Sequence, residues 1–438
     1  MPSPVRRTLR IVTAVVTVLT AFAAQLDAQD WPRWRGQHFD GVSRETGLLN
    51  PWPKEGPRQI WQVGLSGGFS TVAVADGRLF TQTKDGTHEL VLCLDAATGK
   101  ELWRHRYVAD YDAHVTFTSG PRPDSRTGPR ATPTVDGDRV YVMGATGILI
   151  ALEAKTGKEI WQHQMLRPAG KFPIADPRST FPPAEVPMHG ISSSPLVVGD
   201  RLYVAPGGPS GKTLAALDKN TGKVIWEALD DGVGHASPIW SEVAGSPQLI
   251  FLTATAAVGL APQNGRLLWR YPWKTTFDLN VATPVVADGQ VFISSNYGKG
   301  GALLRLNNTE TPEKVWESVS MQNHFSTSVL HEGFLYGFSS TRLRCVDFKT
   351  GEVRWDKTGF GIGSVIVADG NLIVLGEHGQ LVLAKATPSA FTEISRTQVF
   401  PEETLTWTVP VVAGGRLFVR HQNGLVALEL QPTRPVDP

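Results

Sequence analysis

Six polar or aromatic residues stand at comparable places in a sequence that repeats itself, each shortly before a short apolar run. Such side chains can hold an anion or a small polar ligand through charge, hydrogen bonds and ring contacts. If the apolar runs are strands around one axis, the residues that precede them converge on a single opening. We therefore predict a ligand-binding site there, formed by Arg130, His189, His235, Asn280, His324 and Trp407.

The three histidines of this set raise the question of a metal. Zinc in proteins needs nitrogen or sulfur ligands that close a tetrahedron. His189 and His235 belong to neighbouring repeats, but His324 lies two repeats beyond His235, so we predict an opening without a metal. The sequence also has no phosphate-binding loop or His-Glu-x-x-His motif. No residue is therefore assigned a catalytic role.

The composition excludes several classes of protein. The 438 residues carry 42 Lys and Arg against 41 Asp and Glu, a net charge of +1, whereas a nucleic-acid-binding protein shows a basic excess or stripe. Two cysteines are too few for a disulfide scaffold, a zinc ribbon or an iron–sulfur site. There is no Cys-x-x-Cys-His motif for haem attachment.

The first 28 residues predict an export signal rather than part of the fold. Arg6, Arg7 and Arg10 precede an apolar run from Ile11 to Ala24, which is shorter than the roughly 20 residues of a membrane span. A retained anchor helix is the alternative. No cysteine comes directly after the run, so a lipid anchor is not expected. The mature chain, residues 29–438, is expected to be periplasmic or secreted, without a membrane span.

The rest of the sequence repeats one phrase, an apolar strand followed by a turn and a tryptophan, as in LCLDAATGKELW, which ends at Trp103. One large flat residue per repeat, always at one register, is typical of packing between neighbouring sheets. A degenerate copy, LVLAKATPSAFTEI, puts Ile394 at the tryptophan position. The predicted docking residues are Trp61, Trp103, Trp161, Trp226, Trp269, Trp316 and Trp355.

A second phrase, of the form ATPTVDGDRVYV, alternates with the first. Its Asp-Gly or Gly-Asp pair suits a tight hairpin, so each unit predicts four short antiparallel strands. Units of this length predict an all-β closed ring, a β-propeller. The final unit, VPVVAGGRLFVRHQNGLVALEL, lacks a fourth strand, which RQIWQVGL near the N-terminus supplies. This count gives eight four-stranded blades closed by the N-terminal strand; seven blades is the alternative.

Residues 29–438 are thus predicted to form one domain with two insertions, at 106–130 and 163–191. Both follow the fourth strand of their unit and bring aromatic and arginine side chains to one face, as a protein-binding patch would. A solvated or disordered lid is the alternative. Cys93 and Cys345 share one register in repeats that lie far apart around the ring, so we predict two free, buried thiols.

The phrase Asp-x-x-Thr-Gly-Lys-x-x-Trp resembles the tryptophan-docking repeat of quinoprotein alcohol dehydrogenases and their relatives. The segment DWPRWRGQHFDGVSRETGLLNPWP is similar to the N-terminal segment of exported PQQ-like repeat proteins. The resemblance covers essentially the whole chain after the signal and implies a PQQ-like β-propeller. This family includes pyrroloquinoline-quinone (PQQ) dehydrogenases and non-catalytic propellers of the BamB type. The vicinal cysteines of the enzymes and the lipid-anchor cysteine of the BamB type are both absent.

Three hypotheses about function follow. The leading hypothesis is an exported, non-catalytic scaffold that binds an envelope protein or peptide through the insertion face or a blade edge. The alternative is a PQQ-dependent alcohol or sugar dehydrogenase, which would require the quinone with calcium. A small-molecule sensor or carrier is the third. The residues themselves assign no cofactor, and we expect a monomer.

Overall fold

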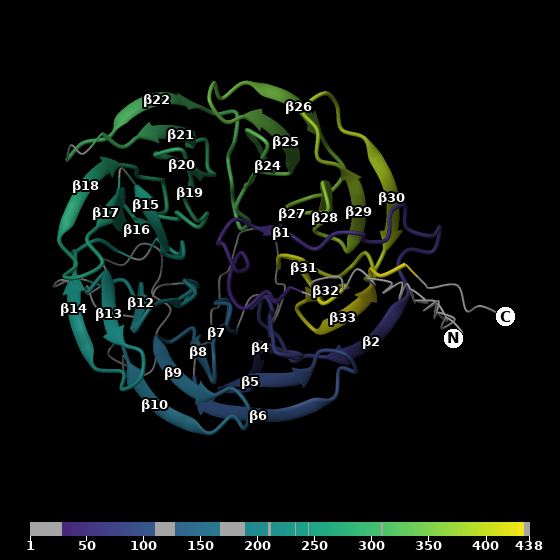
Figure 1. The fold of residues 1–438 in the computed structure, drawn as a ribbon, viewed down its shortest axis with the longest axis horizontal. Helices are drawn as coiled ribbons and strands as arrows, with labels where there is room; N and C mark the ends of the chain where they lie inside the picture. The colour runs from purple at the N-terminus through teal and green to yellow at the C-terminus, as the bar shows by residue number, and fades with distance from the viewer. Residues whose placement is uncertain are drawn as a thin grey trace, which may run out of the picture.

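The computed structural model describes residues 29–109, 128–166, 189–208, 212–232, 234–243, 245–307 and 310–432. These residues form strands and no helix, and the strands build eight sheets around a common centre (Figure 1). Each sheet contains a blade of four antiparallel strands, and the sheet of blade 7 has a fifth, parallel strand from the N-terminal side. The predicted all-β, eight-bladed propeller is therefore confirmed, and the alternative of seven blades is wrong.

The first four blades follow one another along the chain. Blade 1 contains β3 (Ala73–Ala75), β4 (Arg78–Asp85), β5 (His88–Asp95) and β6 (Glu101–Val108). Blade 2 contains β7 (Thr134–Asp136), β8 (Arg139–Met143), β9 (Ile148–Glu153) and β10 (Glu159–Gln164). Blade 3 contains β11 (Leu196–Val198), β12 (Arg201–Val204), β13 (Leu214–Asp218) and β14 (Val224–Ala228). Blade 4 contains β15 (Ile239–Val243), β16 (Ser246–Leu252), β17 (Ala256–Leu260) and β18 (Leu267–Pro272).

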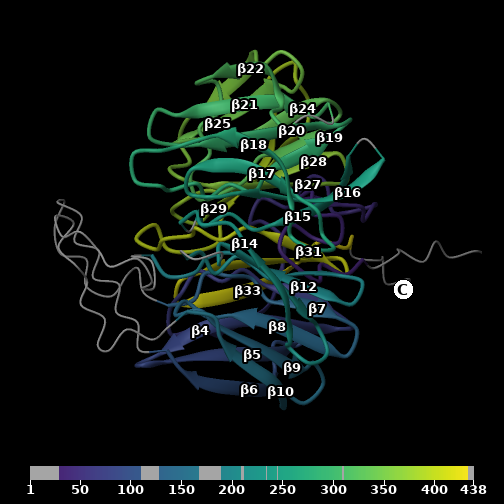
Figure 2. The same ribbon diagram turned by 90° about the vertical axis from the view of Figure 1, so that its left-hand side faces the viewer.

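The other four blades complete the ring, which Figure 2 shows from its side. Blade 5 contains β19 (Val285–Ala287), β20 (Gln290–Ser295), β21 (Gly300–Arg305) and β22 (Glu313–Ser318). Blade 6 contains β23 (Val329–His331), β24 (Phe334–Ser339), β25 (Arg342–Asp347) and β26 (Val353–Lys357). Blade 7 contains β27 (Ser364–Ala368), β28 (Asn371–Leu375), β29 (Gln380–Lys385) and β30 (Glu393–Gln398). Blade 8 contains β31 (Val411–Ala413), β32 (Arg416–His421), β33 (Gly424–Glu429) and, from the N-terminal side, β2 (Gln59–Gly64).

Tight turns join the two inner strands of a blade. Asp76 and Gly77 both have positive φ, 50° and 70°, and so do Asp288 and Gly289, at 51° and 72°. Two central residues with positive φ match the right-handed twist of the strands on either side. The Asp-Gly pairs of the second repeated phrase therefore form the hairpins that the sequence predicted.

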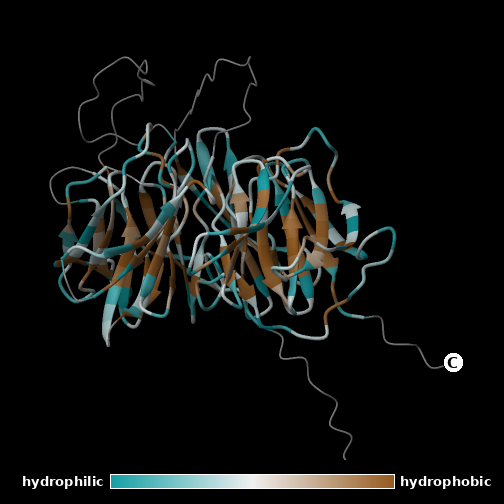
Figure 3. Cartoon of the chain, turned by 90° about the horizontal axis from the view of Figure 1, so that it is seen from above, coloured by the Kyte–Doolittle hydropathy of each residue, from teal (hydrophilic) through white to brown (hydrophobic). Residues whose placement is uncertain are grey.

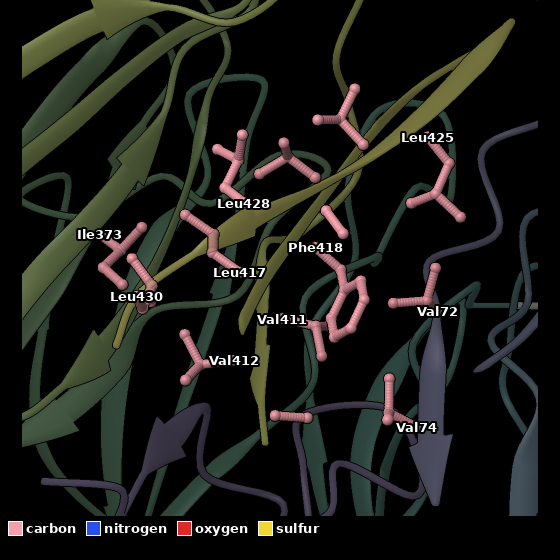
Figure 4. Packing of buried hydrophobic residues seen from close by; sticks show 14 of the residues in the cluster. Val72, Val74, Ile373, Val411, Val412, Leu417, Phe418, Leu425, Leu428 and Leu430 are labelled. Atoms are coloured by element: carbon pink, nitrogen blue, oxygen red, sulfur yellow. The ribbon is translucent and has the colours of Figure 1, made fainter. Parts of the chain in front are cut away.

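The ring is closed by β2, which pairs antiparallel with β33 and places Trp61 opposite Ala427. At the seam between blades 8 and 1, Val411 and Phe418 face Val72 and Val74 in one buried cluster (Figure 4). Apolar residues lie along the strands and polar ones along the loops (Figure 3). Closure by a strand from the other end of the sequence is thus confirmed.

The outer tryptophans connect each blade to the next. The indole N–H of Trp61 donates to Ala96 O over 3.1 Å, and that of Trp103 donates to Ala154 O over 3.1 Å. A Cβ on Gly157, in the turn beneath Trp103, would come within 2.5 Å of the indole. The glycine of the Thr-Gly-Lys turn therefore leaves the space that the indole occupies. Four further indoles donate in the same way: Trp161 to Lys219 O, Trp226 to Pro262 O, Trp316 to Phe348 O and Trp355 to Thr387 O. Trp269 instead donates to Gln248 Oε1 of its own blade, over 2.7 Å.

Blade 7 has no tryptophan at this register. Strand pairing places Ser395 opposite Leu383, so the prediction that Ile394 holds the tryptophan position is wrong by one residue, because the turn before β30 is longer than in most of the other copies. Trp52, which is 5% exposed, donates its backbone N–H to Ser395 Oγ over 3.0 Å and packs in the cluster of blade 8. The N-terminal segment thus supplies the missing indole.

A strap formed by residues 31–45 crosses the channel at the end where the inner hairpins turn (Figure 1). Trp31 pairs with Val74 of blade 1, Arg33 donates to Val197 O of blade 3, and Arg35 donates to Ser328 O at the start of blade 6. Within the strap, β1 (Val42–Ser43) adds in parallel to β27 of blade 7. Glu45 accepts the backbone N–H groups of Gly414 and Gly415 in blade 8. The strap therefore covers this end of the channel.

Both cysteines are free and buried, as the shared register predicted. Burial raises the pKa of each thiol to about 12, so neither is a reactive thiolate at neutral pH. The predicted export signal at 1–28 lies outside the described residues, as does most of the insertions at 106–130 and 163–191. The described residues contain no helix long and apolar enough to cross a membrane.

Candidate functional site

A cavity of about 450 Å³ lies in the channel, at the end of the ring opposite the inner hairpin turns. We call it the funnel. The segments that lead into the innermost strand of all eight blades contribute to its wall, so residues far apart in the sequence meet there. Five of the six residues that the sequence placed at this opening line the funnel: Arg130, His189, His235, His324 and Trp407.

The strap forms the far end of the funnel. Trp34 lines the cavity and donates its indole N–H to Thr283 Oγ1 over 2.9 Å. Since the strap also bonds to the inner strands of the surrounding blades, the funnel is blind at this end. A ligand has to enter and leave on the side of the loops that precede the inner strands.

One half of the funnel is basic and comes from the loops before blades 2, 3 and 4. Arg130 donates to His189 O over 2.8 Å, and the rings of His189 and His235 meet edge to face with centroids 5.9 Å apart. Burial, with the nearby charges of His189 and Arg130, lowers the pKa of His235 to about 3. His235 is therefore neutral at pH 7, when it can both donate and accept a hydrogen bond.

His235 has a left-handed backbone, with φ at 70°, which costs about 1–3 kcal/mol for a residue other than glycine. The backbone N–H of Ala236 donates to Asn280 O over 3.0 Å and fixes this turn. Asn280 itself is fully buried and does not line the funnel, although its neighbours Leu279 and Val281 do. Its amide donates to three backbone carbonyls and accepts the hydroxyl of Ser295. Asn280 thus positions the wall.

Replacing Asn280 with alanine is expected to lower the free energy of unfolding by about 2–4 kcal/mol, because buried carbonyls lose their donor. Chemical denaturation measures the change. Asn371→Ala is the matched control, since Asn371 is half-buried and its amide makes one such bond, to Asp369 O, so its loss should cost about 1 kcal/mol or less. Equal effects of the two substitutions would contradict the positioning role.

The other half of the funnel is an arc of aromatic rings from blades 1, 8, 6 and 5. Phe69 packs on Trp407 with centroids 5.2 Å apart, and Trp407 packs on Phe325 at 4.8 Å. Phe325 stacks on His324 at 3.7 Å, and His324 meets Tyr297 at 5.3 Å and shares a hydrogen bond of 2.9 Å with its hydroxyl. Burial lowers the pKa of His324 to about 4, and its buried Nδ1 has no hydrogen-bond partner among the described residues. We call this set the aromatic arc.

Glu377 is the one carboxylate among the described residues that line the funnel. It accepts the indole N–H of Trp407 over 2.9 Å and the backbone N–H of Ile362 over 3.0 Å. Its negative charge therefore holds the aromatic arc in place, on a different side of the funnel from Arg130.

Hydroxyl groups join the blades around the funnel. In several blades the serine or threonine two residues before the inner strand accepts a backbone N–H from the preceding blade. Thr132 N donates to Ser194 Oγ over 2.9 Å, and Ser194 N donates to Ser237 Oγ over 2.9 Å. Thr283 N donates to Thr327 Oγ1, and Val409 N donates to Thr71 Oγ1. These repeated hydroxyls join the blades at the axis.

The donor set does not fit a calcium ion with a quinone. Calcium takes six to eight oxygen ligands, and the described lining residues offer one carboxylate, which already accepts two N–H groups. No group of three or more histidine, cysteine or acidic side chains comes together in the described part of the chain. A quinone–calcium pair therefore has no ligand set among the described residues that line the funnel.

Several residues of the funnel were missed from the sequence. Tyr297 and Glu377 lie in the loops between the second and third strands of blades 5 and 7, whereas the prediction considered only the segments before the first strand. Phe69 and Phe325 precede first strands, and aligning blade 1 with the others would have found Phe69. Trp34 belongs to the strap, for which the repeats carry no signal.

Comparison with known proteins finds a matching family and two groups of relatives. The family model described as "Outer membrane protein assembly factor BamB" matches residues 53–180 and 184–357. The quinohemoprotein alcohol dehydrogenase ADH IIB of Pseudomonas putida is 32% identical over 242 residues, which are 52% of this chain and 31% of that protein. The outer membrane protein assembly factor BamB of Moranella endobia is 24% identical over 268 residues, 58% of this chain and 64% of that protein.

The chain thus spans about a third of the first relative and just under two thirds of the second. Among solved structures, BamB from Moraxella catarrhalis superposes with a TM-score of 0.60 at 16% identity and covers 85% of this chain and 100% of that one. At this identity the likeness shows the fold alone.

Proposed function

Since the chain belongs to the family described as outer membrane protein assembly factor BamB, whose members are PQQ-like repeat propellers, we propose that it is a non-catalytic binding propeller of the cell envelope. It is exported by the predicted signal at 1–28 and holds a protein or peptide partner. The observation that carries the proposal is the blind funnel, whose wall comes from all eight blades and combines an aromatic arc with a basic half.

The wall of the funnel suits binding better than chemistry. His235 and His324 stay neutral at pH 7, and the one lining carboxylate accepts N–H groups from Trp407 and Ile362. General acid–base catalysis works best with groups that titrate near the working pH, and neither of these histidines does. Aromatic side chains with an arginine are instead the residues that dominate binding energies at protein interfaces.

A quinone-dependent alcohol or sugar dehydrogenase is the second candidate. The 32% identity with the quinohemoprotein alcohol dehydrogenase over 242 residues favours it. The described lining residues offer no ligand set for calcium, and the sequence has no Cys-x-x-Cys-His haem motif; both speak against it.

Two measurements on the mature chain, residues 29–438, test the proposal. Calorimetry with pyrroloquinoline quinone and calcium, and a panel of alcohols and sugars with an artificial electron acceptor, should show neither stoichiometric binding nor turnover. A photo-crosslinking residue at Phe277, which is 61% exposed beside the funnel, should capture one envelope partner in cells. The same residue at Lys349, in an exposed turn at the opposite end of the ring, is the matched control and should not capture it.

Tight quinone binding with turnover would overturn the proposal in favour of the dehydrogenase. Crosslinks of equal yield from both positions would show that the funnel side is not the binding face.

A further inference from the structure

The blind end of the funnel restricts the kind of polymer that can use it. An extended polypeptide cannot run through the channel, because Trp34 and the rest of the strap cover the far end. A partner that inserts its backbone has to insert an end of its chain. This step rests on the proposed function, which makes the partner a protein or peptide.

The charge of the funnel decides which end fits. Arg130 lines one side together with His189 and His235 and donates to Gly128 O and His189 O, whereas Glu377 lies on another side and accepts N–H groups from Trp407 and Ile362. A carboxylate placed beside Arg130 gains a charge-assisted hydrogen bond, while an ammonium group there would meet a like charge. The carboxyl-terminal end of a chain is therefore complementary to the basic half.

The aromatic arc continues out of the funnel onto the rim. Tyr297 lines the cavity, is 38% exposed and meets Phe277 edge to face with centroids 5.2 Å apart. Phe277 and Val319 are each 61% exposed, and Val319 lies beside Gly300 at the base of the same loop as Tyr297. Exposed apolar groups that gather beside a cavity mark a binding surface. A small carboxylate held inside the funnel would leave this rim uncovered, whereas an extended chain of several residues would cover it.

We propose that the funnel and its rim bind the carboxyl-terminal segment of a polypeptide, with the terminal carboxylate at Arg130 and apolar side chains on the aromatic arc and on Phe277. The last side chain packs against Trp407 and Phe325. The segment then leaves over Tyr297. Recognition of a chain end in this way is an established mode of peptide binding.

A peptide array tests the proposal while the partner is still unidentified. Hexapeptides with two randomised terminal residues are displayed with a free carboxylate, with a terminal amide, or with a free amino end. The mature chain is expected to bind the free-carboxylate set at least tenfold more strongly than the amides, with aromatic or large apolar residues enriched at the last position. Equal binding of acids and amides, a preference for free amino ends, or no binding to any set would overturn the proposal.

Variants assign the effect to the two parts of the surface. Arg130→Gln should reduce the affinity for the best acid to that for its amide, and Arg130→Lys should restore part of the difference. Arg58→Gln, on the outer side of blade 8 with its side chain 67% exposed, is the control and should change nothing. Thermal unfolding of each variant verifies that the ring is intact.

A substitution on the rim distinguishes a peptide end from a small carboxylate as the ligand. Phe277→Ser should weaken the best hexapeptide about tenfold and leave N-acetylphenylalanine unaffected. Equal affinities for the hexapeptide and N-acetylphenylalanine would overturn the peptide end in favour of a small-molecule ligand. If Phe277 crosslinks to a partner in cells but the arrays show no preference for carboxylates, this inference fails while the proposed function stands.

Discussion

Replacing Arg420 with methionine is expected to lower the free energy of unfolding by about 3–5 kcal/mol, the largest loss that we expect from one substitution in this chain. Arg420 is 1% exposed and lies on β32 of the closing blade. Burial lowers the pKa of its guanidinium to about 9, so the group remains charged at pH 7. It donates across the closing seam to blade 1, to the carbonyls of Gly67, Gly68, Ser70 and Gln82 and to the hydroxyl of Thr81.

Methionine fills a similar space but donates no hydrogen bond, so these buried oxygens would all lose a donor. Chemical denaturation at pH 7 measures the effect. Arg416→Met on the same strand is the control, since Arg416 is half-buried and donates to Gly414 O of its own turn, and it should cost about 1 kcal/mol or less. A loss of less than about 1 kcal/mol for Arg420→Met would show that the seam does not depend on these bonds.

The second large effect concerns the pH dependence of stability. Glu89 is 1% exposed at the contact between blades 1 and 2, and burial raises its pKa to about 7. It accepts the hydroxyl of Tyr107 over 2.6 Å and the backbone N–H of Ala145 over 3.2 Å, but these bonds offset the loss of hydration only in part. The folded chain therefore holds a proton on Glu89 at a pH at which the unfolded chain has released it.

The sign follows from this difference in proton binding. A raised pKa of an acid contributes stability that is complete below the unfolded value of 4.5 and is lost as the pH rises to about 7. Glu89→Gln removes the titration and keeps the shape. Between pH 5 and pH 8 the free energy of unfolding of the natural chain is therefore expected to fall by about 2–3 kcal/mol relative to that of the variant.

Denaturation curves of both chains at several pH values measure this gain. Glu403→Gln, in an exposed turn, is the control, and its stability should change with pH as that of the natural chain does. Parallel curves for Glu89→Gln as well would show that the buried carboxyl is already ionised throughout this range.

The number and closure of the blades could be predicted because every blade buries the same contacts. The docking tryptophan, the Thr-Gly-Lys turn beneath it and the Asp-Gly hairpin each satisfy a local requirement that recurs along the sequence. Where this local requirement changes, the predicted position of a residue was wrong. A longer turn moved the position opposite Leu383 from Ile394 to Ser395, and a repeat alone does not reveal such a shift.

The candidate site could be predicted only as far as the repeats reach. Leu279 and Val281 line the funnel but Asn280 between them does not, because successive side chains of an extended segment point in opposite directions. A register error of one residue therefore moves a side chain from the cavity into the wall. The strap was beyond prediction for another reason: its partners are inner strands of several blades, which become neighbours only in the closed ring.

The pairing of β2 with β33 also sets an order of events for the newly made chain. The segment that completes the ring is synthesised near the start, yet its partner strand follows only after the first seven blades. Contacts between such distant segments carry the largest entropy of loop closure and form slowly. Until then β33 presents an unpaired edge to any other extended chain. The maturing protein is thus most vulnerable to aggregation just before its last blade is complete, and a holding chaperone would help it most at that stage.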